Sequence, residues 1–200
     1  MKTCSETIAV GGVELHVVRP ADPDALLDED AFAEDEFLPY WAELWPAGLA
    51  LAEALPPELA GLRVVELGCG LGVPSLVAAA RGARVTAVDW AADAIALLRE
   101  NAARNGLELE TVHADWRSFD GRFDLVLAAD VLYEARNVEP LAELVSRLAL
   151  QALVGLAGRP CERGFLERAR GFGRVHEHGR IARIEPRNAR QRGETVPSPE

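Results

Sequence analysis

The most constraining feature of this chain is a short apolar run that ends in a glycine-rich loop. Residues 63–67 are apolar and β-branched, as in a buried parallel strand, and the loop after them carries Gly68, Gly70 and Gly72. An apolar stretch with helical character begins at Val73, and free N–H groups at a helix start attract electronegative groups. Glycines let the backbone turn sharply and come close to a ligand. The segment predicts a strand, a binding loop and a helix.

A second predicted strand, 84–88, ends in Asp89, where a carboxylate can accept hydrogen bonds from both hydroxyls of a ribose. The spacing of the glycines narrows the choice of nucleoside. Dinucleotide sites use Gly-x-Gly-x-x-Gly beside a pyrophosphate, whereas here the spacing is Gly-x-Gly-x-Gly with Glu66 two residues before it. A carboxylate at Glu66 would repel a diphosphate but suits a cofactor with a positive sulfonium and ammonium group.

Strands and helices alternate along most of the chain. The hydrophobic pattern predicts strands at 63–67, 84–88, 109–113, 123–128 and 150–156, helices at 73–81, 92–105, 137–148 and 162–171, and two last strands near 173–185. A hairpin is expected around Gly11-Gly12, and a helix over 41–55 that Pro46 interrupts near its start. This order predicts an α/β fold: a Rossmann-like, doubly wound, mostly parallel seven-strand sheet with helices on both faces and an N-terminal β-hairpin.

Length and composition favour one domain over residues 1–200, because 49% of the residues are hydrophobic and no repeat or linker divides the chain. Residues 1–40 are expected to hold the hairpin and an acidic loop, and residues 41–200 the Rossmann-like core. The acidic loop is interpreted as a solvated, solubility-promoting segment; its acids are Asp22, Asp24, Asp28, Glu29, Asp30, Glu34, Asp35 and Glu36.

The charge balance bears on the partners. The formal net charge is −11, and Lys2 is the only lysine, so nucleic acid is not expected as a partner and cationic or neutral partners fit better. The three cysteines lack metal-ligand spacing, which favours reduced thiols in a cytoplasmic protein and no metal site. No apolar leader or membrane-spanning segment is found in the sequence, so no membrane association is expected.

Ligands of such sheets bind at the carboxyl ends of the strands. Asp115 and Trp116 follow the third core strand, where a carboxylate can accept from an adenine amino group and an indole can stack on the ring. The segment from Ala129 to Tyr133 follows the fourth core strand, which predicts a position beside the reactive end of the cofactor.

With these residues in place, the run from Glu66 to Gly72 resembles motif one of class I S-adenosylmethionine-dependent methyltransferases. The whole chain is similar to the family-sixteen branch, which holds protein-lysine methyltransferases and nicotinamide N-methylase-like proteins. The resemblance rests on the hairpin, residues 38–46, Asp89, the Asp115-Trp116 pair, and Asp130-x-x-Tyr133, which is similar to the family's D/E-x-x-Y/F signature. Among characterised members, the Trp45-Pro46 pair most resembles the electron-transfer-flavoprotein lysine methyltransferases.

Motif and resemblance together define the predicted site. Asp130 and Tyr133 are the predicted catalytic residues, which would border the substrate nitrogen and orient it or accept its proton. The predicted cofactor-binding residues are Trp45, Glu66, Gly68, Cys69, Gly70, Gly72, Asp89, Trp90, Asp115, Trp116 and Ala129.

The resemblance implies an N-methyltransferase that uses S-adenosyl-L-methionine, releases S-adenosyl-L-homocysteine and methylates a protein lysine side chain. A small amine such as nicotinamide is the alternative acceptor. A nicotinamide-dependent oxidoreductase and a non-catalytic cofactor-binding protein are lesser alternatives. The identity of the acceptor, the degree of methylation and the oligomeric state are left open by the sequence.

Overall fold

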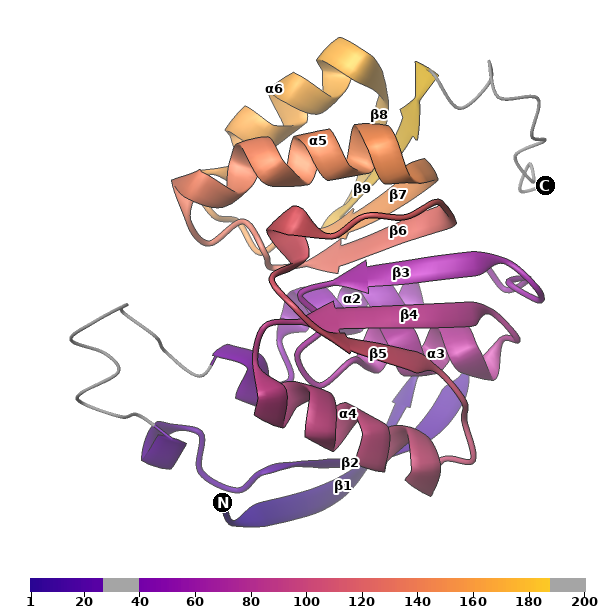
Figure 1. Cartoon of the computed structure of the whole chain (residues 1–200), viewed down its shortest axis with the longest axis vertical. Coiled ribbons are helices and arrows are strands. Elements are labelled where there is room, and N and C mark those ends of the chain that lie inside the picture. The colour runs from indigo at the N-terminus through magenta and orange to yellow at the C-terminus, as the bar shows by residue number, and fades with distance from the viewer. Residues whose placement is uncertain (27–39, 188–200) are drawn as a thin grey trace.

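The computed structural model describes residues 1–26 and 40–187. Its centre is a seven-stranded sheet with the order β5-β4-β3-β6-β7-β9-β8 (Figure 1). Strands β3 to β7 are all parallel to one another, and β9 is antiparallel to both of its neighbours, β7 and β8. The predicted sheet is confirmed; its strands are β3 (Arg63–Leu67), β4 (Arg84–Asp89), β5 (Glu110–His113), β6 (Phe123–Ala129), β7 (Ala149–Gly155), β8 (Gly173–His178) and β9 (Ile181–Pro186).

Helices cover both faces of this sheet, and two hydrophobic clusters lie beneath them. Side chains alternate along β3, so Val64 belongs to one cluster and Val65 to the other. The first cluster packs under α2 (Pro46–Glu53), α3 (Val73–Ala80) and α4 (Ala92–Arg104), and the second under α5 (Val138–Leu148) and α6 (Glu162–Phe172). Short 3-10 turns complete the chain: η1 (Asp24–Leu26), η2 (Tyr40–Ala42), η3 (Trp116–Ser118) and η4 (Ala135–Asn137).

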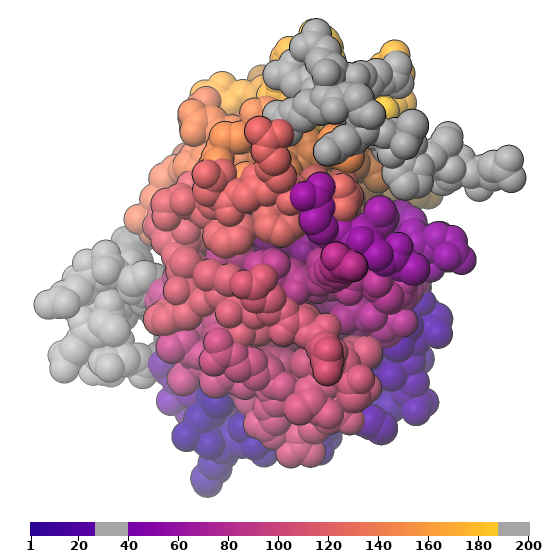
Figure 2. All heavy atoms as spheres, turned by 45° about the vertical axis from the view of Figure 1, so that its right-hand side comes forward, coloured from indigo at the N-terminus to yellow at the C-terminus, as the bar shows by residue number. Residues whose placement is uncertain are grey.

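The N-terminal hairpin is also confirmed, and it is longer than its sequence pattern indicated. It pairs β1 (Thr3–Val10) with β2 (Val13–Pro20) in antiparallel register. Gly11 and Gly12 form its turn with φ of 59° and 70°, the left-handed values that two-residue hairpin turns require. The hairpin and the C-terminal elements β8 and β9 lie at opposite ends of the molecule (Figures 1 and 2).

Two asparagines hold the hairpin against the core: Asn101 in the last turn of α4 and Asn105, which follows the end of that helix. The side chain of Asn101 accepts from Val18 N at 2.7 Å and donates to Val18 O at 3.0 Å. Asn105 bonds His16 in the same manner, at 2.8 and 2.9 Å. The two side-chain amides therefore bond the backbone N–H and C=O groups of β2, as the backbone of a neighbouring strand would.

One predicted element is wrong in its first part. The helix expected over 41–55 begins only at Pro46, and residues 40–42 form η2 instead. Trp45 is extended, with φ −67° and ψ 137°, because the ring of a following proline excludes the helical conformation. Pro46 then takes the first helical position, where its missing N–H costs nothing.

The described residues do not cover every sequence prediction. The acids from Asp28 to Glu36, and the residues Leu38 and Pro39 that contribute to the family resemblance, lie outside them. In the described ranges, none of the helices combines the length and apolar character needed to cross a membrane. One domain over residues 1–200 stays a prediction.

Candidate functional site

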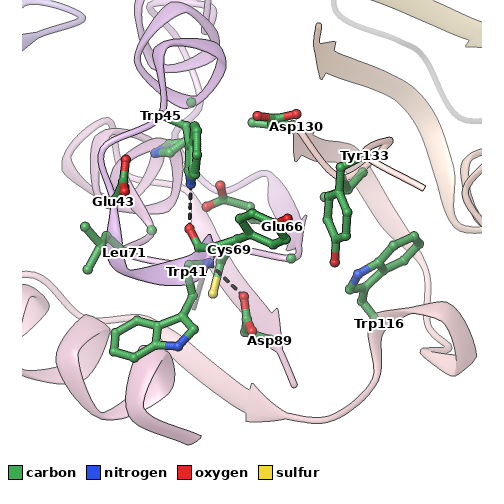
Figure 3. A pocket seen from close by; sticks show the side chains of 18 of the residues that line it. Trp41, Glu43, Trp45, Glu66, Cys69, Leu71, Asp89, Trp116, Asp130 and Tyr133 are labelled. Carbon is green, nitrogen blue, oxygen red and sulfur yellow. Dashed lines mark hydrogen bonds between the residues drawn. The ribbon is translucent and has the colours of Figure 1, made fainter. Parts of the chain in front are cut away.

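A pocket of about 310 Å³ lies at the carboxyl ends of β3, β4 and β6, next to η2 and the start of α2 (Figure 3). It falls where the strand order reverses, because the chain leaves β3 for β4 and β5 and then returns to the other side of β3 at β6. Its size lies at the lower end of the range of about 300–1,000 Å³ for small-ligand sites. All of the predicted site residues line it: Trp45, Glu66, Gly68, Cys69, Gly70, Gly72, Asp89, Trp90, Asp115, Trp116, Ala129, Asp130 and Tyr133.

The glycine loop joins β3 to α3, and its three glycines have φ of 67°, 51° and 69°. A Cβ on the first would lie 2.8 Å from Val131 Cγ1, and one on the second 3.2 Å from Trp41 O. On the third, Gly72, it would lie 2.5 Å from Leu98 Cδ1. The glycines are therefore required by the close approach of three other segments of the chain, in addition to the turn itself.

Asp89 is buried at the end of β4 and ties the glycine loop to that strand. Its Oδ2 accepts from Gly70 N at 2.8 Å, and its Oδ1 accepts from Ala91 N at 2.9 Å (Figure 3). Burial raises the pKa of Asp89, while these backbone bonds oppose the rise. The backbone N–H of Trp90 also acts on this carboxylate. Because a carboxylate has about four lone-pair sites, Asp89 retains acceptor capacity for a ligand hydroxyl.

Glu66 is buried beneath the same loop. Its Oε2 accepts from Ser75 N at 2.9 Å and from Ser75 Oγ at 2.5 Å. Burial raises the pKa of Glu66 to about 8, the Ser75 bonds lower it, and the charge of Asp89 raises it further. A positive charge brought into the pocket would favour the ionised form. The expected contact between Glu66 and a cationic cofactor stays a prediction.

Asp115 and Trp116 begin the turn η3 after β5. The carboxylate of Asp115 holds Arg117 with two prongs, Nε to Oδ1 at 2.9 Å and Nη2 to Oδ2 at 2.8 Å. Arg117 lowers the pKa of Asp115. Trp116 is buried in the second hydrophobic cluster as well as lining the pocket, so its ring serves the core and the site together.

Three aromatic side chains, Tyr40, Trp45 and Tyr133, gather at the pocket and are called the aromatic group below. The rings of Tyr40 and Tyr133 lie 5.2 Å apart at 49°, and those of Tyr40 and Trp45 lie 6.2 Å apart in an edge contact. The indole N–H of Trp45 donates to Tyr40 O at 2.5 Å. Tyr40 and Tyr133 are exposed, although large rings usually pack in the interior.

The two predicted catalytic residues do not converge on one point. The Tyr133 hydroxyl lies at the end of the ring that faces Trp116, and Asp130 lies beyond the other end (Figure 3). Burial raises the pKa of Tyr133. The carboxylate of Asp130 is engaged by Arg159, a residue for which the sequence analysis made no prediction. Their catalytic roles stay predictions.

Several lining residues were missed by sequence reasoning. Arg159 follows the carboxyl end of β7, so the same strand-end rule that found Asp89 could have found it. Other lining residues were not predicted as site residues, although some lie within segments that the sequence analysis singled out: Tyr40, Trp41, Glu43, Leu71, Arg117, Glu134, Arg136 and Asn137. Within residues 1–26 and 40–187, no three His, Cys, Asp or Glu side chains come together as metal ligands.

Comparison with known proteins assigns the domain. Residues 64–150 match a family described as "Methyltransferase domain". Over these residues the chain is similar to methyltransferase domains. The matched stretch runs from β3 to the start of β7, and it therefore contains the glycine loop, Asp89, Asp115 and Tyr133. The sequence-based resemblance to class I methyltransferases is confirmed.

The methyltransferase domain has relatives with different acceptors. The Ribosomal protein L11 methyltransferase of Pelobacter propionicus is 34% identical over 70% of this chain and 43% of its own length. The Electron transfer flavoprotein beta subunit lysine methyltransferase of Danio rerio is 33% identical over 60% of this chain and 51% of its own length. The chain thus spans about half the length of these curated relatives or less.

A solved structure resembles the methyltransferase domain in fold. The 16S rRNA N2 G1207 methyltransferase of T. thermophilus, determined with AdoMet and guanosine, has a TM-score of 0.69. It is 20% identical, and the match covers 94% of this chain and 51% of the other. At that identity the likeness establishes the fold of the sheet and its helices.

Proposed function

We propose that this chain is an S-adenosylmethionine-dependent N-methyltransferase that methylates a lysine side chain of a protein. The observation that carries the proposal is the position of the buried Asp89. Its carboxylate is bonded to the glycine loop at Gly70 and retains acceptor sites at the pocket. The aromatic group lines the same pocket, which supports a nucleoside site and an acceptor site within one cavity.

The residues present fit this cofactor. All three residues line the pocket: Asp89 would accept from the ribose hydroxyls, Trp116 would contact the adenine, and Glu66 would face the positively charged end. The bound cofactor would supply an electrophilic methyl group and would leave as S-adenosylhomocysteine. The chain supplies positioning, because an in-line displacement needs the acceptor nitrogen within about 3–3.5 Å of the methyl carbon.

The aromatic group supports an amine as the acceptor. A lysine amine has a reference pKa of about 10.4 and must lose a proton before it can attack. Enclosure between Tyr40, Trp45 and Tyr133 would desolvate the amine, which favours its neutral form. After transfer, the same ring faces would stabilise the methylammonium product through cation–π contacts. The net charge of −11 suits a cationic partner.

The paired charges around the pocket argue against a nucleic acid acceptor. Phosphate recognition needs arginines whose charge is available to the ligand. Three arginines line this pocket, and each forms an ion pair with a carboxylate that also lines it. The pairs are Asp115–Arg117, Glu134–Arg136 and Asp130–Arg159. The two curated relatives above, whose names specify a ribosomal protein and a flavoprotein subunit, agree with a protein acceptor.

The test has two arms. Calorimetry of the purified chain with S-adenosylhomocysteine and with a nicotinamide dinucleotide should show affinity for the first only. Incubation with a tritiated methyl donor and a cell extract, separated into protein, RNA and small-molecule fractions, should label protein. Label in the small-molecule fraction alone would instead support an amine such as nicotinamide, and label in RNA alone would refute the charge argument.

A single substitution tests the acceptor side of the site without changing the cofactor side. Tyr133→Phe removes one hydroxyl from the aromatic group and leaves Asp89 and the glycine loop intact. We expect the affinity for S-adenosylhomocysteine to be nearly unchanged and protein labelling to fall by about 10-fold or more. Unchanged labelling would exclude a catalytic role for the hydroxyl.

A further inference from the structure

Arg159 and Asp130 join the loops that follow two neighbouring strands. Arg159 lies between β7 and α6, and its Nε and Nη2 donate to the two carboxylate oxygens of Asp130, each at 2.9 Å. The side chain of Asp130 is 8% exposed and that of Arg159 is 37% exposed, and both line the pocket. A two-pronged contact of this kind is stronger and more directional than a single hydrogen bond.

The backbone of Asp130 is held as firmly as its side chain. Asp130 follows the last residue of β6, and its N–H donates to Gly155 O of β7 at 3.1 Å. Its φ is 51°, and in the described ranges it is the only residue other than glycine with a positive φ. Such a conformation persists only where the surroundings enforce it. Here the neighbouring strand and Arg159 together enforce it.

The segments on either side of the ion pair are fixed too. The buried carboxylate of Glu162 accepts from Ala157 N at 2.6 Å and from Gly158 N at 3.0 Å, which secures the loop that carries Arg159. The side chain of Asn137 donates to Val131 O at 2.7 Å, which secures the residue after Asp130. The turn over residues 130–134, which carries Tyr133, is therefore fixed from β7 and from the residue that precedes α5.

This arrangement is poorly suited to proton acceptance by Asp130. Both carboxylate oxygens already accept charge-assisted bonds, and a proton on either oxygen would remove the negative charge that strengthens both bonds to Arg159. The bond to Asp130 raises the pKa of Arg159, so the guanidinium stays charged in any workable assay. The carboxylate has the features of a structural anchor rather than of a base.

We propose that Asp130 and Arg159 form a positioning pair that fixes the turn carrying Tyr133 at the acceptor side of the pocket, and that the proton of the acceptor amine leaves without Asp130. This inference rests on the proposed N-methyltransferase function. It assigns a role to Arg159, and of the two roles that the sequence left open for Asp130 it excludes that of proton acceptor.

Four variants test the pair: Asp130→Asn, Arg159→Gln, their double mutant and Arg159→Lys. Arg163→Gln is the matched control, because Arg163 pairs with Glu167 at 3.0 Å on the exposed side of α6 and does not line the pocket. The measurements are kcat and KM from tritium transfer to labelled protein between about pH 6 and 9, and the Kd for S-adenosylhomocysteine. Hydrogen exchange of the amides of residues 131–134 reports on the turn without any turnover.

We expect Asp130→Asn and Arg159→Gln each to lower kcat by about 10- to 100-fold, because a misplaced acceptor loses alignment with the reacting carbon. The kcat of the double mutant should be no lower than that of the less active of these two single variants, because both substitutions remove the same contact. The shape of the kcat–pH curve and the Kd should match those of the wild-type protein. Amides 131–134 should exchange faster in Arg159→Gln, Arg159→Lys should restore part of kcat, and the control should match wild type.

The proposal would be overturned by one pattern of results: Asp130→Asn loses turnover and has an altered kcat–pH curve, while Arg159→Gln stays near wild type. Asp130 would then be the proton acceptor. Additive losses in the double mutant, or unchanged exchange of amides 131–134 in Arg159→Gln, would also overturn it. A wild-type chain that binds no S-adenosylhomocysteine would instead refute the proposed function, and the exchange measurement would still decide whether the pair fixes the turn.

Discussion

Gly72 offers a quantitative test of why the loop after β3 has a third glycine. In Gly72→Ala, the new Cβ would lie 2.5 and 2.8 Å from the two methyl carbons of Leu98 and 3.1 Å from its Cγ. Leu98 is fully buried in the first hydrophobic cluster, so its side chain has no free space to move into. The backbone of Gly72, with φ of 69°, adds strain for any residue with a Cβ.

The expected cost has two parts. A left-handed conformation costs alanine about 1–2 kcal/mol, and forcing an extra carbon into a packed core costs about 1–3 kcal/mol. Gly72→Ala should therefore lower the free energy of unfolding by about 2–5 kcal/mol. Gly12→Ala is the matched control, because Gly12 has φ of 70° but a Cβ added there would meet no atom within 4 Å. It should lose only the backbone part, about 1–2 kcal/mol.

Urea unfolding followed by tryptophan fluorescence measures both variants. The double mutant Gly72→Ala/Leu98→Ala then isolates the contact, because shortening Leu98 removes the atoms that the new Cβ would meet. Its loss should be smaller than the sum of the two single losses by about 1–3 kcal/mol. Equal losses for Gly72→Ala and Gly12→Ala, or strictly additive losses in the double mutant, would refute the packing argument.

Three further results are expected. Asp89→Asn should weaken binding of S-adenosylhomocysteine by about 10- to 100-fold in calorimetry, since bonds to a charged acceptor contribute about 1.5–3 kcal/mol; an unchanged Kd would place the ribose elsewhere. The pKa of Glu66 is raised from 4.5 to about 8, so the folded state binds the extra proton. Stability should therefore fall as pH rises from 4.5 through 8, and urea unfolding of Glu66→Gln should show a shallower fall. Asn101→Leu leaves the N–H and C=O of Val18 without their partner, so urea unfolding should show a loss of about 2–4 kcal/mol, and a loss below about 1 kcal/mol would contradict the docking role of Asn101.

The sheet and the pocket could be predicted because their signals are local. Strands β3, β4, β6 and β7 are mainly apolar runs, and glycines mark the ends of several of them. The carboxyl ends of parallel strands meet at one edge, so residues that follow different strands, such as Gly68, Asp89 and Asp130, were expected to meet there. The structure places all three at one pocket.

Contacts between residues far apart in the sequence could not be predicted in this way. Arg159 and Asp130 are separated by 29 positions, and Asn101 and Val18 by 83. No periodic pattern specifies which arginine meets which carboxylate, or that an asparagine replaces a neighbouring strand. The prediction that Asp130 orients the substrate nitrogen or accepts its proton depended on its position after a strand and on the family motif, and neither reveals that both carboxylate oxygens already accept bonds from Arg159.

The proposed cofactor side and acceptor side of the pocket differ in the groups that bind their acidic side chains. Asp89 accepts from the backbone N–H groups of Gly70 and Ala91, and these neutral donors leave its negative charge in place. At the acceptor side, Asp130 faces Arg159, and Glu134 faces Arg136, so each pair contributes little net charge. The negative charge of Asp89 therefore lies where the cationic cofactor is proposed to bind. Selection of the acceptor must then depend on ring contacts and shape at the aromatic group, which is why its identity does not follow from the charge pattern of the sequence.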